Sequence, residues 1–428
     1  MTETTSTEEA ATDAVIRAQA LRLATDLLTR WSERAPGPHG TGTAADDTPP
    51  GDPAVPVLAA LLAETGEPSA VAAASRATVV WARGAGRGGG GQRGLYGGGL
   101  AGTLVGLRHA AAVHPELHAV ADRLRDRLLG DDAPGGPAPH GQVPHGQAPY
   151  GQVTFADYDL VLGPSGVLLA LTAGLDSAAP SVDLAPYADR LATLCDAPEL
   201  DGLRARYAGH ELLDWMDGRV NTGMGHGVAG VTVALTAAVR HLGTRPEWVN
   251  ALRNAVRWLT AQAFTDARGV RTWDGAGLDG LAPPPGARTR QAWCYGTPGV
   301  AWALWDAADA LGDAATAAWA DEAFTTLAGG YDEEFHLFGD HPGDRLGLCH
   351  GASGVLAVAD AFHRHAAPHP AASLLRTRLL RHLSAREDEL CELSASRTGL
   401  LGGAGGALSA VLTATGGTRG WLPCLGLR

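Results

Sequence analysis

The sequence predicts an all-α fold, an α/α toroid in which an inner ring of helices is wrapped by an outer ring. Two observations lead to this prediction. A glycine-framed turn recurs six times along the 428 residues, and apolar, helix-like runs alternate with charged, amphipathic ones. Because a repeat of this kind buries its helices against neighbouring repeats, we expect a single domain over residues 1–428 with about seven helical hairpins.

The recurring turn consists of a glycine, two or three residues, a second glycine, and then a run of small and aliphatic residues. The copies are "GLYGGGLAGTLVGL" from Gly94, "LVLGPSGVLLAL" from Leu160, "GMGHGVAGVTVAL" from Gly223, "WCYGTPGVAWAL" from Trp293, "LCHGASGVLAVA" from Leu348 and "GLLGGAGGALSAVL" from Gly399. Their closing glycines are Gly102, Gly166, Gly230, Gly299, Gly354 and Gly406, at intervals of 64, 64, 69, 55 and 52 residues. Such an interval holds two helices of roughly 12–18 residues with their connections.

The run after each glycine pair is almost entirely Ala, Val and Leu, which predicts a helix buried on most sides. Segments such as 118–130 and 247–264 carry the charge and have one apolar face. In the first 85 residues, helical patterns near 14–32 and 54–82 indicate a seventh pair whose turn lacks the glycine signature. Glycine suits these turns because it allows positive φ and close backbone approach. If all turns lie at one end of the ring, their residues converge on one mouth.

Two stretches interrupt the repeats, and both are predicted to be flexible insertions. Residues 35–56 are rich in Pro, Gly, Thr and Asp, and residues 131–153 contain "PHGQVPHGQAPYGQV". The second stretch holds His140 and His145, for which weak metal binding is an alternative. Proline and glycine at this density favour a disordered loop, because they leave no packed core to orient ligands.

Charge and cysteine content narrow the class of protein. With 33 basic and 46 acidic residues, the net charge is −13, which argues against a nucleic-acid partner. The acidic N-terminus lacks the features of a secretory signal, and no apolar stretch reaches the roughly 18–20 residues of a membrane span. We therefore expect a cytoplasmic protein that is not an integral membrane protein. In that compartment, five cysteines fit metal or catalytic use better than disulfides.

Cys294, Cys349 and His350 carry the strongest chemical signal, because they lie in copies of the same turn. Thiolate and imidazole are preferred zinc ligands, and three protein ligands leave a fourth position open for water or substrate. Neighbouring turns of a ring would bring them to one point. The alternative is that both cysteines are small apolar fillers. Cys195, Cys391 and Cys424 lie outside the glycine turns and are interpreted as structural or incidental.

Other polar residues of the turns have structural alternatives as well. His226 occupies the turn before Cys294, although a histidine among small residues is often purely structural. Asp159 precedes another turn, where helix N-capping is the alternative, and Asp157 stands close by. Arg290 precedes Cys294 by four residues and Tyr295 follows it directly; either fits a surface or core position equally well.

Together, "NTGMGHGVAG", "RQAWCYGTPG" and "LCHGASGVL" resemble the signature blocks of the lanthionine cyclases, the LanC-like family. The resemblance extends through all six glycine turns, roughly residues 90–410, and the WCYG and CHG blocks are highly specific. It implies an α/α toroid with a zinc ion at its mouth. Two positions depart from the usual pattern: Gly225 replaces a common alanine, and Pro164 replaces an acidic or small residue.

Carried over residue by residue, the resemblance implies zinc ligation by Cys294, Cys349 and His350. The same carry-over implies an active-site set of His226, Asp159, Arg290 and Tyr295. The insertion at 131–153 precedes the aspartate block, so Asp157 remains a fallback for Asp159.

The implied reaction is thioether ring closure in a ribosomally made precursor peptide. A cysteine thiolate adds to dehydroalanine or dehydrobutyrine, giving lanthionine or methyllanthionine. The chain resembles the stand-alone class I cyclases, so the implied partners are a dehydrated precursor with leader and core, a separate dehydratase and an exporter. Two alternatives stay within the family: a LanC-like enzyme that adds glutathione, and a non-catalytic binding protein.

Two rivals from other classes share a toroidal fold. A prenyltransferase β-like subunit also activates a thiolate on zinc, but its ligand set includes a carboxylate and it lacks the WCYG and CHG pair. A six-hairpin glycosidase needs paired carboxylates at the mouth, and the glycine turns contain none.

Overall fold

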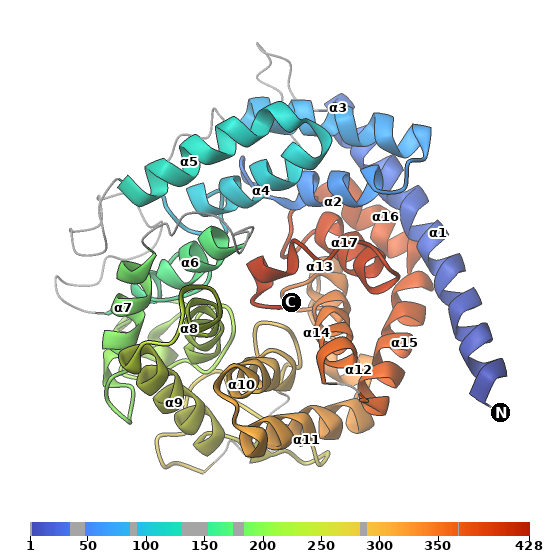
Figure 1. Cartoon of the computed structure of the whole chain (residues 1–428). Coiled ribbons are helices and arrows are strands. Elements are labelled where there is room, and N and C mark those ends of the chain that lie inside the picture. Colours follow the sequence, from blue (N-terminus) through green and yellow to red (C-terminus); the bar gives the residue numbers. More distant parts are fainter. Residues whose placement is uncertain are drawn as a thin grey trace. The chain divides into compact units, whose positions relative to one another are not determined.

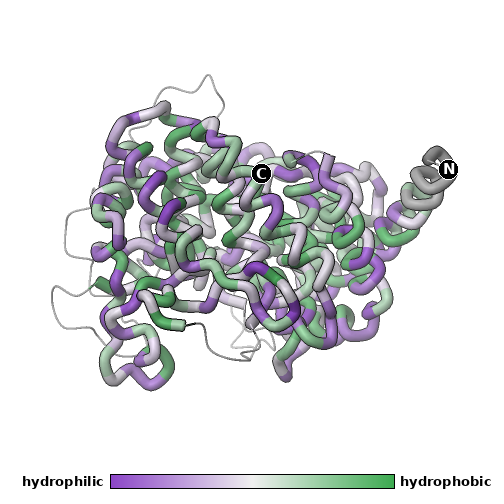
Figure 2. The backbone as a smooth tube through the Cα atoms, turned by 90° about the horizontal axis from the view of Figure 1, so that it is seen from below, coloured by the Kyte–Doolittle hydropathy of each residue, from purple (hydrophilic) through white to green (hydrophobic). Residues whose placement is uncertain are grey.

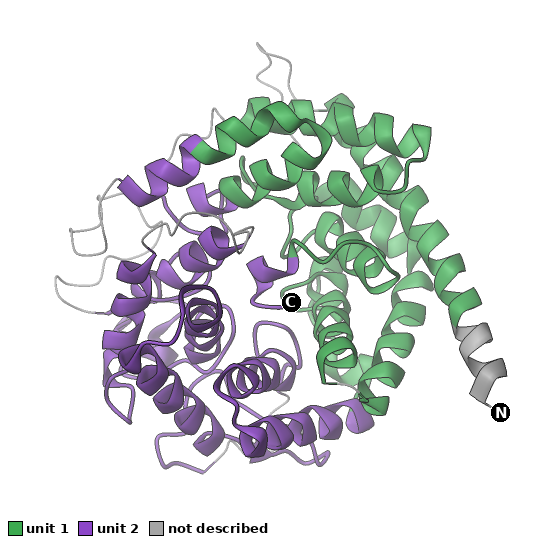
Figure 3. Ribbon diagram, in the orientation of Figure 1, with its two compact units in different colours: residues 1–89, 103–122, 331–421 green, residues 90–102, 123–330, 422–428 purple. Residues whose placement is uncertain are grey.

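The computed structural model describes residues 2–34, 48–85, 92–130, 153–173, 184–282, 289–366 and 368–428, and these are mainly helical (Figure 1). Two compact units are distinguished in Figure 3. Unit 1 comprises residues 1–89, 103–122 and 331–421, and unit 2 comprises residues 90–102, 123–330 and 422–428. The chain passes from one unit to the other within two of its helices, α4 (Leu100–Val113) and α5 (His118–Gly130).

Unit 2 is built around three buried helices, α6, α8 and α10, with α8 packed against both of the others. The amphipathic helices α7, α9 and α11 cover them, and α9 buries one face through Trp248, Leu252 and Leu259. A short antiparallel pair joins β1 to β2 with Phe264 opposite Thr272. The bounds are α6 Pro164–Thr172, α7 Ala185–Leu194, α8 Val228–Leu242, α9 Pro246–Ala261, β1 Phe264–Thr265, β2 Arg271–Thr272, α10 Thr297–Leu311 and α11 Ala314–Gly330.

Unit 1 has the same construction. The buried helices α2, α14 and α17 pack side by side, α3 covers α2, α15 covers α14, and α1 lies against α3, α15 and α17. The bounds are α1 Thr2–Arg34, α2 Ala54–Ala63, α3 Pro68–Ala85, α12 Glu333–His336, α13 Pro342–Leu346, α14 Ala352–His365, α15 Pro370–Ser384, α16 Glu387–Ser396 and α17 Ala404–Ala414. Hydrophobic and hydrophilic stretches alternate along many helices in Figure 2, as expected where one face is buried.

The glycine turns are confirmed as the starts of buried helices. A glycine is the N-cap of α6, α8, α10, α14 and α17. The closing glycine then lies against the backbone six residues earlier: a Cβ at Gly299 would lie 2.1 Å from the Trp293 carbonyl oxygen, and one at Gly230 2.3 Å from that of Met224. Close backbone approach therefore explains these glycines. At the N-cap Gly296, a positive φ of +79° also explains the glycine.

Backbone hydrogen bonds join each turn to the next within a unit. In unit 2, the N–H of Leu160 donates to the Gly225 carbonyl at 3.1 Å, and that of Met224 donates to the Cys294 carbonyl at 2.9 Å. In unit 1, the N–H of Cys349 donates to the Leu401 carbonyl at 2.8 Å. These bonds form a turn-to-turn ladder, and the turns can approach this closely because their glycines have no side chains.

The seventh buried helix is α2, and its start uses a carboxylate in place of a glycine turn. One oxygen of Asp52 accepts from the Ala54 N–H at 2.9 Å and from the Leu400 N–H at 3.0 Å. The second bond extends the turn-to-turn ladder from the sixth glycine turn to α2. Here a side-chain carboxylate accepts the turn-to-turn hydrogen bond that a backbone carbonyl accepts in the other repeats. The repeat that contains α2 therefore does not need the glycine signature.

Most of the predicted insertions, residues 35–47 and 131–152 with His140 and His145, lie outside the described residues. The boundary at residue 56 was wrong, because Ala54, Val55 and Pro56 form the buried first turn of α2. The proline-rich composition misled the prediction, since proline is well tolerated in a first helical turn. Among the described helices, none combines the length and apolar character needed to cross a membrane.

We expect Gly299→Ala to lower the free energy of unfolding by roughly 1–3 kcal/mol or more, because its methyl group must displace the Trp293 carbonyl. Gly329→Ala is the matched control in the same unit: it lies in α11 with nothing within 4 Å of an added Cβ, so alanine should add about 0.5–1 kcal/mol. Urea denaturation followed by circular dichroism measures both. Equal stability of the two variants would contradict the close-approach explanation.

Candidate metal centre and its polar surroundings

The turn-to-turn ladder fixes the backbones of both cysteines in the glycine turns. Cys294 and Cys349 each stand five residues before the closing glycine of their turn. The Cys294 carbonyl accepts from Met224, and the Cys349 N–H donates to Leu401. His350 follows Cys349 and so occupies the same turn position that His226 has in its own repeat. The repeated turn thus places thiols and imidazoles at equivalent positions.

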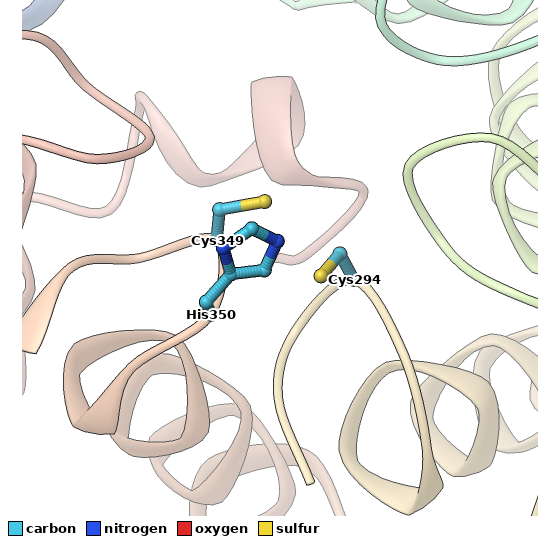
Figure 4. A group of neighbouring side chains, drawn as sticks. All are labelled: Cys294, Cys349 and His350. Carbon is cyan, nitrogen blue, oxygen red and sulfur yellow. The ribbon is translucent and has the colours of Figure 1, made fainter. Parts of the chain in front are cut away.

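Cys294, Cys349 and His350 each offer one ligand atom, and these atoms all lie within 4.8 Å of one another (Figure 4). A tetrahedral zinc ion with bonds of about 2.0–2.3 Å holds such ligand atoms roughly 3.5–3.8 Å apart, so each pair would have to approach by roughly 1.3 Å at most. Two thiols and an imidazole are also donors that zinc prefers. The predicted ligand set therefore fits a metal ion.

An acidic side chain stands beside the histidine of this cluster. The Asp344 carboxylate lies 3.5 Å from Nδ1 of His350. A carboxylate next to a ligating imidazole orients the ring and favours coordination through its other nitrogen. Asp344 itself lies on the short helix α13.

The second polar feature is a carboxylate–imidazole pair in unit 2. Nδ1 of His226 lies 2.6 Å from Oδ2 of Asp159. Asp159 is fully buried, whereas 37% of the His226 side chain is exposed. Because an ionised carboxylate only accepts hydrogen bonds, Nδ1 carries the proton in this pair, and Nε2 is the ring nitrogen that Asp159 does not contact.

Backbone N–H groups hold Asp159 in position. Its second oxygen, Oδ1, accepts from the Leu162 and Gly163 N–H groups at 2.7 and 2.8 Å. These donors offset the cost of burying a carboxylate. Asp157 is engaged elsewhere: it forms a capping box with Thr154 and an ion pair with Arg190 at 3.2 Å. The structure therefore places Asp159, and not the fallback Asp157, against His226.

An aromatic ring supports the imidazole from one side. Phe155 stacks on His226 with ring centroids 5.0 Å apart and planes at 21°. The Tyr207 ring contacts Phe155 in turn, and the Tyr207 hydroxyl accepts from the Phe155 N–H at 2.9 Å. Burial raises the pKa of Tyr207 to about 12, so this phenol stays neutral at physiological pH.

Arg290 and Tyr295 flank Cys294, and both are half-buried. The Arg290 carbonyl lies beneath Gly296, where an added Cβ would approach it to 2.2 Å. The Tyr295 hydroxyl accepts from the Asn221 amide at 3.0 Å. Next to Cys294, the Trp293 indole donates to the Leu425 carbonyl at 2.9 Å. The final residues of unit 2 therefore contact this glycine turn.

The other three cysteines lie outside the glycine turns. Cys195 ends α7 and Cys424 lies in a short 3-10 turn; both are buried. Cys391 lies on α16 and is half-buried.

Sequence reasoning missed three residues of these surroundings: Phe155, Asn221 and Asp344. Asn221 stands inside the quoted block "NTGMGHGVAG", and Asp344 lies six residues before His350. An asparagine or aspartate in a loop gives no signal of its own, because capping and turn formation use the same residues. Their roles appear only through their contacts.

A helical, repeat-built fold with a Cys, Cys, His cluster at its glycine turns defines an α/α toroid with a candidate metal centre. The lanthionine synthetase C-like family model matches residues 96–422, so the chain belongs to that family. Among solved structures, the chain is similar to nisin cyclase, with a TM-score of 0.72, 19% sequence identity, and coverage of 95% of this chain and 96% of that one. No curated protein sequence matches the chain.

These comparisons confirm the predicted family and the predicted α/α-toroid fold. At 19% identity the likeness to nisin cyclase concerns the fold. What the residues of this chain do at the candidate site therefore depends on their own geometry.

Cys195 and Cys391 test whether burial decides the reactivity of the cysteines outside the glycine turns. Burial raises its pKa to about 12, so at pH 8 its thiolate population is roughly a thousandfold below that of an ordinary cysteine. We expect iodoacetamide to leave Cys195 unmodified in the folded protein while Cys391 reacts. Peptide mass mapping after timed alkylation measures this, and equal rates at the two cysteines would contradict it. In denaturant, both should react.

Proposed function

We propose that the chain is a zinc-dependent cyclase that forms lanthionine or methyllanthionine rings by adding precursor-peptide cysteines to dehydroalanine or dehydrobutyrine. The observation that carries this proposal is the cluster of Cys294, Cys349 and His350 in a lanthionine synthetase C-like chain. The His226–Asp159 pair supports catalysis over a passive binding role, because it presents a group that can exchange protons near neutral pH.

Cys294, Cys349 and His350 would hold the metal. A peptide cysteine with its usual pKa near 8.5 is only about 3% thiolate at pH 7, and a zinc ion bound by these residues supplies the means to deprotonate it. The two cysteine ligands would add negative charge around such an ion, which would keep a bound thiolate nucleophilic.

In the proposed reaction, a sulfur–Cβ bond forms as the Cα–Cβ π bond breaks, and the electron pair moves onto the amide carbonyl as an enolate. The thiol proton is released to solvent, and His226, protonated on both ring nitrogens, donates a proton to Cα through Nε2 and becomes neutral. Asp159 holds the ring in the required tautomer and stabilises the imidazolium before transfer. Arg290 and Tyr295 are assigned to the enolate oxygen, where a cation and a hydroxyl donor stabilise developing charge.

The substrate side of the proposal is a dehydrated precursor peptide with its leader. A separate dehydratase must make the dehydroamino acids that this reaction consumes, and an exporter is the expected downstream partner. Incubation of the zinc-loaded protein with a dehydrated, cysteine-containing peptide tests the activity. Ring closure leaves the mass unchanged and removes reactivity towards a thiol alkylating reagent. A glutathione adduct formed in place of rings would support the glutathione-adding alternative.

We expect the purified protein to contain about one zinc ion per chain. Cys349→Ala should reduce that content to near zero, because only two ligands then remain, while Cys391→Ala should retain it. Elemental analysis after dialysis against a weak chelator measures both, with circular dichroism as the check on folding. A zinc-free wild-type protein, or a fully loaded Cys349→Ala variant, would contradict the ligand assignment.

Asp159→Asn is expected to lower kcat by about 10²–10⁴-fold with zinc content unchanged. The asparagine oxygen can keep the Leu162 and Gly163 bonds, so its amide then faces Nδ1 of His226 and forces the proton to Nε2. His226→Asn should lose activity to a similar extent. Alkylation-coupled mass spectrometry gives the rates, and Asp157→Asn is the matched control because its partners are Thr154 and Arg190. An Asp157→Asn variant as inactive as Asp159→Asn would reassign the aspartate.

A further inference from the structure

We infer that Asn221 is a positioning residue that fixes the Tyr295 hydroxyl as a hydrogen-bond donor towards the substrate. This inference deepens the proposed function and depends on it for the role of Tyr295. It starts from the contacts of the Asn221 side chain, which is fully buried in unit 2.

The two ends of the Asn221 amide are distinguished by the backbone. The Gly223 N–H points at one end at 2.8 Å. A backbone N–H can only donate, so the atom that it faces must be the amide oxygen, Oδ1. The other end is then the NH₂ group, which lies 3.0 Å from the Tyr295 hydroxyl and 3.9 Å from the sulfur of Met216.

This orientation determines the direction of the next hydrogen bond. An NH₂ group can only donate, so the phenol oxygen of Tyr295 accepts from Asn221. The phenol proton therefore cannot point at Asn221 and is directed to another acceptor. A donor position that is fixed before the substrate arrives requires no reorganisation in the transition state, which is where such a group contributes most.

The surrounding turn holds Asn221 rigidly. Its backbone carbonyl accepts from the Val228 N–H at 2.9 Å, at the start of α8. It also pairs with Ala276 in an isolated β-bridge. A Cβ at Gly227 would lie 2.5 Å from Oδ1, so the glycine of this turn gives the amide its room. The asparagine cannot turn over without disrupting the glycine turn that carries His226.

Asn221→Asp tests the inference, because a carboxylate of the same shape accepts from the Tyr295 hydroxyl and reverses the bond. We expect kcat for ring formation to fall on the order of 10²-fold with little change in KM. In the Tyr295→Phe background, the same substitution should change kcat by no more than about twofold, because the affected hydroxyl is already gone. A merely structural role would lower kcat equally in both backgrounds.

Asn254→Asp is the matched control. Asn254 also lies in unit 2, and its amide donates to the Cys195 and Asp196 carbonyls at 2.9 Å, outside the glycine turns. Its variant should keep the wild-type kcat. If Asn221→Asp fails to fold by circular dichroism, Asn221→Ser replaces it with the same expectation, since serine removes the amide donor without adding a charge.

A second measurement does not require any ring formation. The chain contains three asparagines, Asn221, Asn250 and Asn254, so selective ¹⁵N labelling of asparagine side chains gives three amide signals. Asn221→Asp identifies one by its loss, and Tyr295→Phe should shift that signal alone. An unshifted Asn221 signal, or equal kcat losses in the two backgrounds, would overturn the inference. A wild-type protein that forms no rings, yet shows the shift, would instead count against the proposed function.

Discussion

The hydrogen bond from one glycine turn to the next is the constraint on which the candidate site depends. It requires two stretches of backbone to meet without side chains between them, and the glycines provide this: a Cβ at Gly223 would lie 2.5 Å from the Cys294 carbonyl. Once the bond forms, the start of each buried helix is fixed relative to the next helix of its unit. The thiol, imidazole and carboxylate that precede these helices are positioned as a result, with no dedicated scaffold of their own.

A glycine turn also stabilises the buried Asp159 carboxylate beside the half-buried His226 imidazole. Asp159 is fully buried, and an unpaired carboxylate there would cost several kcal/mol in desolvation. The glycine turn just before α6 offers the N–H groups of Leu162 and of the N-cap residue Gly163, and both donate to one oxygen of this carboxylate. This turn thus offsets the cost of burying the carboxylate that contacts His226, so the fold and the proposed chemistry share one feature.

The features of the fold and of the candidate site that could be predicted from the sequence are those that depend on the recurring glycine turn. The glycine spacing was sufficient for the helical hairpins, the toroid and the three metal-ligand candidates, because these depend on a pattern that recurs along the chain. Asp159 was singled out, but its choice over Asp157 needed the two sets of contacts. Phe155, Asn221 and Asp344 could not be predicted, since each acts through one tertiary contact that leaves no periodic trace. The repeat that contains α2 was predicted only as a helical pattern, because Asp52 replaces its glycine turn.

Backbone N–H groups of the glycine turns orient the side chains of Asp159 and Asn221, one as a hydrogen-bond acceptor and the other as a donor towards its next partner. At Asp159 they donate to one carboxylate oxygen, and the other oxygen accepts from Nδ1 of His226, whose Nε2 is the proposed proton donor. At Asn221 the Gly223 N–H occupies the amide oxygen, and the amide then donates to Tyr295. Asp159 therefore accepts a hydrogen bond from the His226 imidazole, whereas Asn221 donates one to the Tyr295 phenol. Aspartate and asparagine have nearly the same shape, so their exchange at either position is expected to change the packing little and to reverse the direction of the hydrogen bond. In the proposed reaction, the direction of these two hydrogen bonds matters more than the space that the two side chains fill.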